Sequence, residues 1–205
     1  MTKISVKNLK NQKWLSKIAK TEEEKIILAV TGKMAAGKNY VCSELEKLGW
    51  KSIDADILVH KAIEISKDKI LDAFSKIAES EGLNLLNPDG IVNRRAIGQI
   101  VFKNPELLKK QEEIVYPVIN SMIDDFIDEN DRAIINATVL YKTPQILERC
   151  DAVIFVTAPF FVRFFRAKKR DGLSCKQIFL RFKNQKNLLK KYKTFGKNII
   201  IVNNF

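Results

Sequence analysis

Two glycines and a lysine at a fixed spacing are the residues of this chain with the most specific chemistry. They lie in Gly32-Lys33-Met34-Ala35-Ala36-Gly37-Lys38, where the glycines let the backbone turn its N–H groups onto phosphate oxygens. Lys38 brings a positive charge that reaches β- and γ-phosphates, and the start of a following helix adds a partial positive charge. The spacing therefore predicts a loop that binds a polyphosphate.

The stretches on either side of this loop agree with that interpretation. Before it, the apolar, β-branched run of residues 26–31 predicts a buried strand, and after it Val41, Leu45 and Leu48 recur at helical spacing. The simpler alternative is an ordinary strand-to-helix turn with a stray lysine, but the order of strand, glycine loop and helix favours a nucleotide site. We assign nucleotide binding to the whole run of Gly32, Lys33, Met34, Ala35, Ala36, Gly37, Lys38, Asn39 and Tyr40.

One position of the loop departs from the usual pattern. The motif calls for Ser or Thr after the lysine, because that hydroxyl is a magnesium ligand, and this chain has Asn39 there. An amide oxygen can coordinate a hard cation or hold one of its waters, although it is neutral and bulkier than a hydroxyl. The loop therefore predicts a bound nucleotide with a metal ion, and Asn39 is the candidate metal residue.

Two carboxylates follow the next expected strand, which begins at Trp50. They are Asp54 and Asp56, and carboxylates at the carboxyl end of a parallel strand point into the ligand crevice of an α/β sheet. If the strand continues, both point the same way, so that one serves as general base and the other supports the metal or the fold. The alternative is that Asp56 caps a helix over residues 57–65, in which His60 would line the crevice.

Composition limits the class of protein further. The chain has 205 residues and is 46% hydrophobic, enough for one globular domain with a small appended part. No apolar run approaches the roughly 18 residues that span a bilayer. Three cysteines, Cys42, Cys150 and Cys175, are odd in number and lack metal-ligand spacing, which favours reduced thiols. We expect a cytoplasmic protein without membrane association.

The net charge of +12 is concentrated at one end of the chain. Residues 160–205 contain thirteen Lys or Arg and one acid, Asp171, and the remaining residues are balanced. Such a basic region is a solvated surface, a polyphosphate site or a nucleic-acid site. The solvated surface is the simplest of these interpretations, and polyphosphate is favoured over nucleic acid as the partner. Arg163, Arg166 and Arg170 recur at helical steps of three and four residues.

The remaining chain alternates between strands and helices. Further buried strands are expected at residues 133–136, 152–156 and 199–202, whereas residues 66–130 show helical periodicity only. This order predicts an α/β fold with a five-stranded parallel sheet in a three-layer α/β/α arrangement. Residues 1–24 are expected to be a basic extension, with a short amphipathic helix over residues 10–20, outside a domain of residues 25–205.

Taken together, these motifs resemble those of the dephospho-coenzyme A kinases, a family of P-loop kinases, over residues 26–204. The resemblance rests on the phosphate loop, on Asp54-Ala55-Asp56, on the segments 89–106 and 166–174, and on a few single positions. These positions are Arg181, Gln185, Asn203 and Asn204. Tyr116 stands where the family usually has His, and Asn136 begins a stretch that commonly carries an acid.

The resemblance implies an enzyme that uses ATP and Mg²⁺ to phosphorylate the ribose 3′-hydroxyl of dephospho-CoA. It implies that Asp56 is the general base, that residues 66–130 face CoA, and that residues 166–190 form a lid in which Arg166 and Arg170 close over ATP. The catalytic residues expected are Asp56, Lys38 and Arg166, and the substrate-binding residues are Asp54, Asp56, His60, Arg94 and Arg95.

Other functions remain open at this point. They are a P-loop kinase acting on a nucleoside or nucleotide, a nucleotide-binding protein with impaired catalysis, and a basic nucleic-acid binder. Asn39 and Asn136 leave the metal ligands undecided, and the sequence makes no prediction of oligomeric state.

Overall fold

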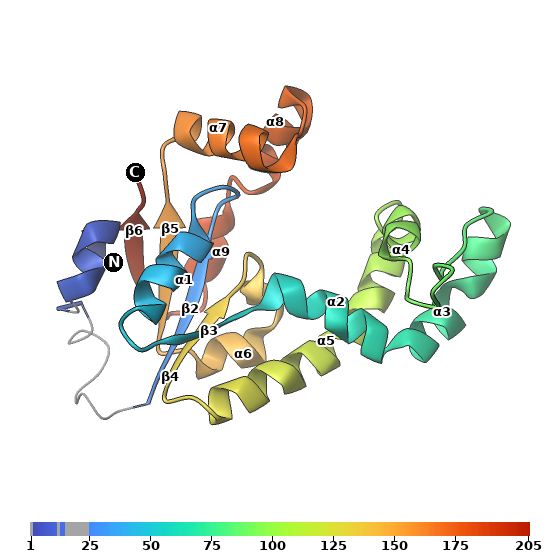
Figure 1. The fold of residues 1–205 in the computed structure, drawn as a ribbon, viewed down its shortest axis with the longest axis horizontal. Helices are drawn as coiled ribbons and strands as arrows, with labels where there is room; N and C mark the ends of the chain where they lie inside the picture. The colour runs from blue at the N-terminus through green and yellow to red at the C-terminus, as the bar shows by residue number, and fades with distance from the viewer. Residues whose placement is uncertain (1, 12, 15–24) are drawn as a thin grey trace. The chain divides into compact units, whose positions relative to one another are not determined.

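A computed structural model describes residues 2–11, 13–14 and 25–205. The chain divides into two compact units, one formed by Met1–Asp54 with Ile123–Phe205 and one by Ala55–Met122. The first unit contains a β-sheet with helices, and the second contains helices (Figure 1).

The first unit is built on a parallel sheet, in the strand order β1-β6-β5-β2-β4-β3. The central strand β2 (Ile26–Gly32) is buried along its whole length, as its apolar, β-branched sequence predicts. It pairs in parallel with β4 and β5, so its carboxyl end meets theirs at one edge of the sheet. The other strands are β1 (Thr2–Ser5), β3 (Lys51–Asp54), β4 (Arg132–Asn136), β5 (Ala152–Thr157) and β6 (Asn198–Asn203).

Helices connect the strands of this unit, as parallel pairing requires. The first, α1 (Lys38–Glu46), buries Val41, Cys42 and Leu45 against alternate residues of the sheet. The chain after β5 forms two basic helices with exposed cationic faces, α7 and α8. The helical elements of the unit are η1 (Val6–Asn11), α1, η3 (Leu140–Lys142), α6 (Pro144–Arg149), α7 (Phe160–Asp171), α8 (Cys175–Asn184) and α9 (Leu188–Lys193).

The second unit is helical, as the periodicity of residues 66–130 predicts. Its helices are α2 (Ala55–Ile65), α3 (Lys67–Ser80), α4 (Arg94–Val101) and most of α5 (Pro105–Asp128), whose last residues belong to the first unit. The Asn93 side chain accepts from the Ala96 amide and caps α4, which fixes where the two arginines at its start lie. An isolated bridge between Leu86 and Val92 closes the loop before α4.

The prediction of five strands is wrong by one, because the N-terminal segment enters the sheet. Strand β1 pairs in parallel with β6, from Thr2 opposite Ile200 to Ser5 opposite Asn203. A four-residue edge strand with an exposed lysine gives too short an alternation to be recognised in the sequence. The helix expected over residues 10–20 lies largely outside the described residues.

Two tryptophans join this N-terminal segment to the core. Trp14 is 4% exposed and stacks on Trp50, with ring centroids 6.4 Å apart and the planes at 26°. Its indole Nε1 donates to the carbonyl of Leu9 at 3.2 Å, and Leu9 is fully buried. Residues that the sequence suggested lie outside the domain therefore contribute to its hydrophobic core.

We predict that Trp14→Ala lowers the free energy of unfolding by about 3 kcal/mol, because the substitution removes a buried aromatic ring and leaves a cavity. Urea unfolding followed by circular dichroism would measure the change. Trp14→Phe is the control, since it keeps ring contact and should cost less than half as much. An unchanged unfolding free energy in Trp14→Ala would show that the stacked pair is not part of the cooperative core.

Candidate active site

The predicted loop lies at the carboxyl end of β2 and leads directly into α1. Gly32 ends β2 so close to the backbone of Val156 that a Cβ there would clash with its carbonyl oxygen. Gly37 has φ +93° and precedes Lys38, and a Cβ there would clash with the side-chain amide of Asn204. Both glycines are therefore required by the fold of the loop. Gly32 allows the backbone of Val156 to approach closely, and Gly37 allows both the approach of Asn204 and a positive φ angle.

Residues far away in the sequence hold the loop in shape. The carbonyl of Ala36 accepts from Asn204 Nδ2 at 2.9 Å and from Arg166 Nη1 at 3.5 Å, and the same Arg166 atom donates to the Asn204 carbonyl at 3.2 Å. Two residues earlier in the turn, the Met34 amide donates to Gln185 Oε1 at 2.6 Å. The loop is thus fixed by α7, by the segment after α8 and by the C-terminus.

Arg163 lies beneath the loop. Its side chain is buried, donates from Nε to the Met34 carbonyl at 3.0 Å, and stacks on Phe182 with 4.0 Å from the guanidinium carbon to the ring centroid. Its Nη2 is buried and has no hydrogen-bond partner in the described part of the chain. A buried guanidinium with a donor to spare favours an anion nearby.

The electrostatics of the loop agree with this. Burial lowers the pKa of Arg163, and burial together with repulsion from Arg163 lowers the pKa of Lys33. Each shift means that the protein disfavours the charged form at this site. A bound polyphosphate would reverse that effect by supplying the opposite charge, so the loop is suited to an anionic ligand.

A second cluster at the same edge of the sheet contains oxygen ligands. Asn136, the last residue of β4, donates from Nδ2 to Asn39 Oδ1 at 3.0 Å and to Asp54 Oδ2 at 3.1 Å. Its own Oδ1 is buried and has no hydrogen-bond partner among the described residues. An orphaned amide oxygen beside a carboxylate and a second amide fits a hard cation such as Mg²⁺.

This cluster contains one carboxylate. No group of three or more His, Cys, Asp or Glu is placed to hold a metal ion within the described residues. Magnesium in nucleotide enzymes is commonly held by one or two carboxylates together with substrate phosphates and waters. The donor set of Asn39, Asp54 and Asn136 therefore fits a metal ion that arrives with its nucleotide.

Buried hydroxyl groups support the base of the loop. Thr31, the last residue of β2 before Gly32, donates to the Thr138 carbonyl at 3.2 Å and lies 3.0 Å from the hydroxyl of Tyr192. The Tyr192 hydroxyl also donates to the Thr138 carbonyl at 3.1 Å, and burial raises the pKa of this tyrosine. Its phenol therefore remains neutral and holds α9 against the end of β2.

The two aspartates do not share one strand. Strand β3 ends at Asp54 and helix α2 begins at Ala55, so Asp56 lies in the first turn of α2. Both carboxylates were expected to point the same way only if the strand continued, and that condition is not met because β3 ends at Asp54. The expectation that Asp56 caps a helix starting at residue 57 is wrong, since α2 starts two residues earlier. Asp54 is half-buried in the oxygen cluster, and Asp56 is exposed.

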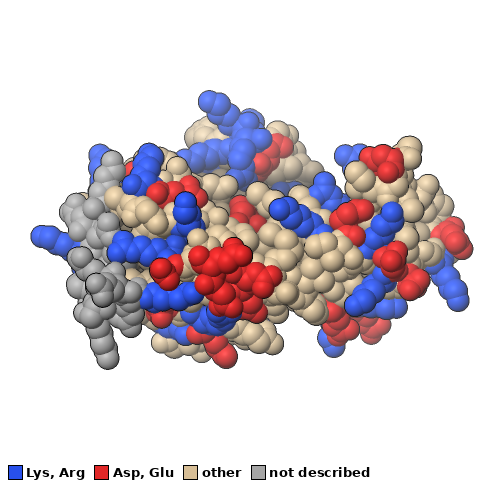
Figure 2. Space-filling view, turned by 60° about the horizontal axis from the view of Figure 1, so that its bottom comes forward, with Lys and Arg blue, Asp and Glu red and all other residues tan. Residues whose placement is uncertain are grey.

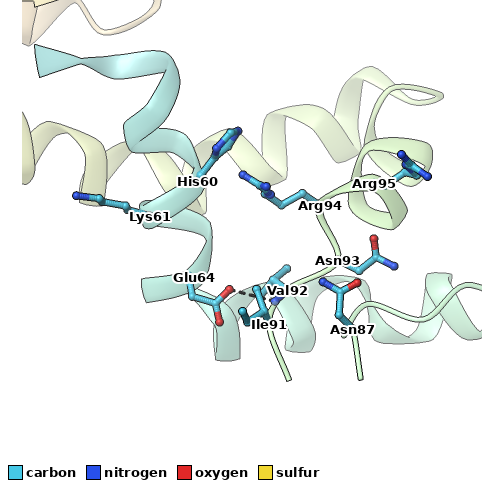
Figure 3. Close-up of a pocket in the computed structure, with 9 residues that line it drawn as sticks. All are labelled: His60, Lys61, Glu64, Asn87, Ile91, Val92, Asn93, Arg94 and Arg95. Atoms are coloured by element: carbon cyan, nitrogen blue, oxygen red, sulfur yellow. Dashed lines mark hydrogen bonds between the residues drawn. The ribbon is translucent and has the colours of Figure 1, made fainter. Parts of the chain in front are cut away.

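The helical unit contains a pocket of about 560 Å³ (Figure 3). Three of its residues are the predicted His60, Arg94 and Arg95, and Figure 3 shows Arg94 extending toward His60. Glu64 Oε2 accepts from the Val92 amide at 3.0 Å and holds the wall of the pocket. The remaining lining residues are Lys61, Asn87, Ile91 and Asn93. Three cationic side chains, Lys61, Arg94 and Arg95, against one acid favour an anionic ligand.

Of the two arginines predicted to bind the nucleotide, the structure places one on the loop. Arg166 contacts the loop, whereas Arg170 forms hydrogen bonds to its neighbour Asp171 at 2.6 and 3.0 Å and is exposed. Arg163, Gln185 and Asn204 contact the loop but were not predicted as site residues. The regular spacing of Arg163 with Arg166, and the presence of Gln185 and Asn204 in the family pattern, were the available signals.

A parallel sheet with a glycine-rich loop between its central strand and a helix, contacted by two arginines, is the arrangement of a P-loop nucleotide-binding protein. Comparison with known proteins specifies the family: residues 26–204 match the model of dephospho-CoA kinase. The chain belongs to this family of phosphotransferases, which acts in the final step of coenzyme A biosynthesis. The predicted family, fold class and type of activity are confirmed, and a nucleoside kinase is not favoured.

Individual relatives agree with this assignment. Dephospho-CoA kinase from Treponema denticola is 36% identical over 188 residues, which cover 89% of this chain and 83% of the relative. The enzyme from Treponema pallidum is 32% identical over 165 residues, covering 78% of each chain. The structure of dephospho-CoA kinase from Campylobacter jejuni superposes with a TM-score of 0.65 at 26% identity, covering 87% of this chain and 88% of that one.

We predict that Gly37→Ala weakens ATP binding at least tenfold, because a Cβ at φ +93° is strained and collides with the Asn204 amide that holds the loop. Calorimetric titration with ATP would measure it. Gly49→Ala is the matched control, since Gly49 has φ +90° and nothing within 4 Å of an added Cβ. Equal affinities for ATP in the two variants would contradict the role of Gly37.

Proposed function

We propose that this chain transfers the γ-phosphoryl group of ATP to the 3′-hydroxyl of dephospho-CoA. The observation that carries the proposal is the phosphate loop held by Arg166 and Asn204, in a chain of the dephospho-CoA kinase family. Phosphoryl transfer depends on positioning and charge neutralisation more than on covalent chemistry. Each group of residues described above has a role in one of these two tasks.

The loop binds the phosphoryl donor. Backbone amides at the end of the loop and at the start of α1 contact the phosphates, and Lys38 neutralises charge at the β- and γ-positions. Arg166 and the buried Arg163 add positive charge from α7. Asn39, Asp54 and Asn136 would hold Mg²⁺, which supplies further neutralisation of the triphosphate when it is bound.

The pocket of the helical unit binds the acceptor. Dephospho-CoA contains a pyrophosphate group, and Lys61, Arg94 and Arg95 supply positive charge to pair with it. His60 adds a ring nitrogen that donates or accepts a hydrogen bond at the same pocket. These contacts orient the acceptor, which lowers the entropic part of the barrier.

Asp56 is the general base in this proposal. A ribose hydroxyl is a weak nucleophile at neutral pH, and a carboxylate within hydrogen-bond reach both orients it and accepts its proton. Asp56 is exposed in the first turn of α2, which leaves its carboxylate accessible to a substrate. Asp54, two residues earlier, is engaged with Asn136 and is assigned to the metal cluster.

The surface and the cysteines support a cytoplasmic enzyme of small molecules. Over most of the face drawn in Figure 2, Asp and Glu lie beside Lys and Arg, whereas a nucleic-acid partner is expected to need a continuous basic surface. Cys42, Cys150 and Cys175 are all free thiols. No helix of the described residues is long and apolar enough to cross a bilayer.

A substrate panel tests the proposal. Purified protein is incubated with ATP, Mg²⁺ and either dephospho-CoA or one of several nucleosides, and the product is identified by mass spectrometry. We expect dephospho-CoA to be converted to CoA with formation of ADP, and the nucleosides to remain unchanged. Turnover of a nucleoside in preference to dephospho-CoA would overturn the proposal.

We predict that Lys38→Ala abolishes detectable kinase activity and weakens ATP binding, because it removes the positive charge facing the β- and γ-phosphates. Circular dichroism would establish that the variant is folded before activity is compared. Unchanged turnover in the folded variant would contradict the phosphate-binding role of the loop.

We predict that Asp56→Asn lowers kcat at least about a hundredfold, because the amide keeps the shape of the side chain but cannot accept a proton. ATP affinity should stay within a few-fold of wild type, since Asp56 is assigned to the acceptor. Steady-state kinetics and ATP titration would separate the two effects.

Asp54→Asn is the comparison for this variant. It should raise the Mg²⁺ concentration needed for half-maximal activity, because it neutralises the one carboxylate of the oxygen cluster. If Asp54→Asn stops turnover at saturating Mg²⁺ while Asp56→Asn stays near wild type, the two roles are reversed.

A further inference from the structure

A second pocket lies beside the phosphate loop, on the side of the N-terminal segment. It has a volume of about 450 Å³, within the range of small-molecule sites. Gly37 belongs both to the loop and to this pocket, so a ligand whose phosphates lie on the loop can extend into the pocket. The pocket is lined by Val6, Lys7, Gly37, Tyr40, Arg166, Asn204 and Phe205.

The lining suits a flat aromatic ligand. Tyr40 and Phe205 are aromatic side chains that are 52% and 72% exposed, although most large apolar side chains of this unit are buried. Arg166 contributes a planar guanidinium, which stacks on rings as well as donating hydrogen bonds. Stacking on aromatic and guanidinium planes is a common way for proteins to bind a nucleobase.

Val6 and Lys7, which line one side of this pocket, come from a part of the chain outside the family match. The match covers residues 26–204, which excludes both of them and also Phe205. The pairing of β1 with β6 places Ser5 opposite Asn203, at the end of both strands. The residues that follow these two, Val6 and Asn204, both line the pocket. Val6 is 9% exposed and packs in the core, whereas Lys7 is exposed.

We propose that the N-terminal segment Thr2–Leu9 and the C-terminal Phe205 complete the nucleotide site of this protein by binding the base of the nucleoside triphosphate. Phe205 stacks on the base, Val6 provides apolar contact, and Lys7 donates to an acceptor atom of the base or its ribose. The inference rests on the proposed function in one respect, namely that the loop binds the triphosphate.

The test compares two ligands that share phosphates and differ in the base. ADP and inorganic tripolyphosphate are titrated calorimetrically into the wild-type full chain and into Lys7→Glu, Phe205→Ala and Lys3→Glu. Lys3→Glu is the matched control, because Lys3 is an exposed lysine of the same segment that does not line the pocket, and the charge change is identical. Thermal melting establishes that each variant is folded.

We expect Lys7→Glu and Phe205→Ala each to weaken ADP binding roughly tenfold. For tripolyphosphate, the affinity of Lys7→Glu should match that of Lys3→Glu, which carries the same charge change. The affinity of Phe205→Ala for tripolyphosphate should match that of the wild type. The inference would be overturned if Lys7→Glu bound ADP as tightly as Lys3→Glu does, and Phe205→Ala as tightly as the wild type does. A wild-type chain that binds neither ligand would instead overturn the assignment of the phosphate loop.

Discussion

The carbonyl of Ala36 is the point on which the nucleotide site depends. Two donors from distant parts of the sequence, Asn204 Nδ2 and Arg166 Nη1, converge on it and hold the turn of the loop in place. Without this contact the turn at Gly37, in a left-handed conformation, would have few constraints. The closing end of the sheet and the basic helix α7 therefore meet at one backbone oxygen, and α7 also contacts the loop through Arg163.

The parts of the site that the sequence predicted are those set by local chemistry. The glycine spacing, the lysine and the flanking apolar periodicity determine the loop by themselves, and Asp54 follows from its place at a strand end. The roles of Gln185, Arg163 and Asn204 depend on tertiary contacts to Met34 and Ala36 across more than a hundred residues of sequence. No local pattern specifies such contacts.

The sixth strand was missed for a different physical reason. An edge strand pairs on one side only, so β1 needs neither length nor continuous apolar character, and four residues with one exposed lysine suffice. The stability of that pairing comes from residues further on, since Leu9 and Trp14 are buried beside Trp50. In the sequence, Trp14 was therefore a better indication than the strand residues that the N-terminal segment packs on the domain.

Two of the departures from the family pattern, Asn39 and Asn136, are explained best together. Asn136 Nδ2 donates to both Asn39 Oδ1 and Asp54 Oδ2. The amide oxygen of Asn39 therefore serves as an acceptor for the amide group of Asn136. A second carboxylate at residue 136 would have repelled Asp54 at the same distance, whereas the neutral amide donates to it. The cluster then provides a single negative charge. In the proposed function, most of the charge that attracts a magnesium ion would consequently come from the triphosphate, and binding of metal and nucleotide would be interdependent.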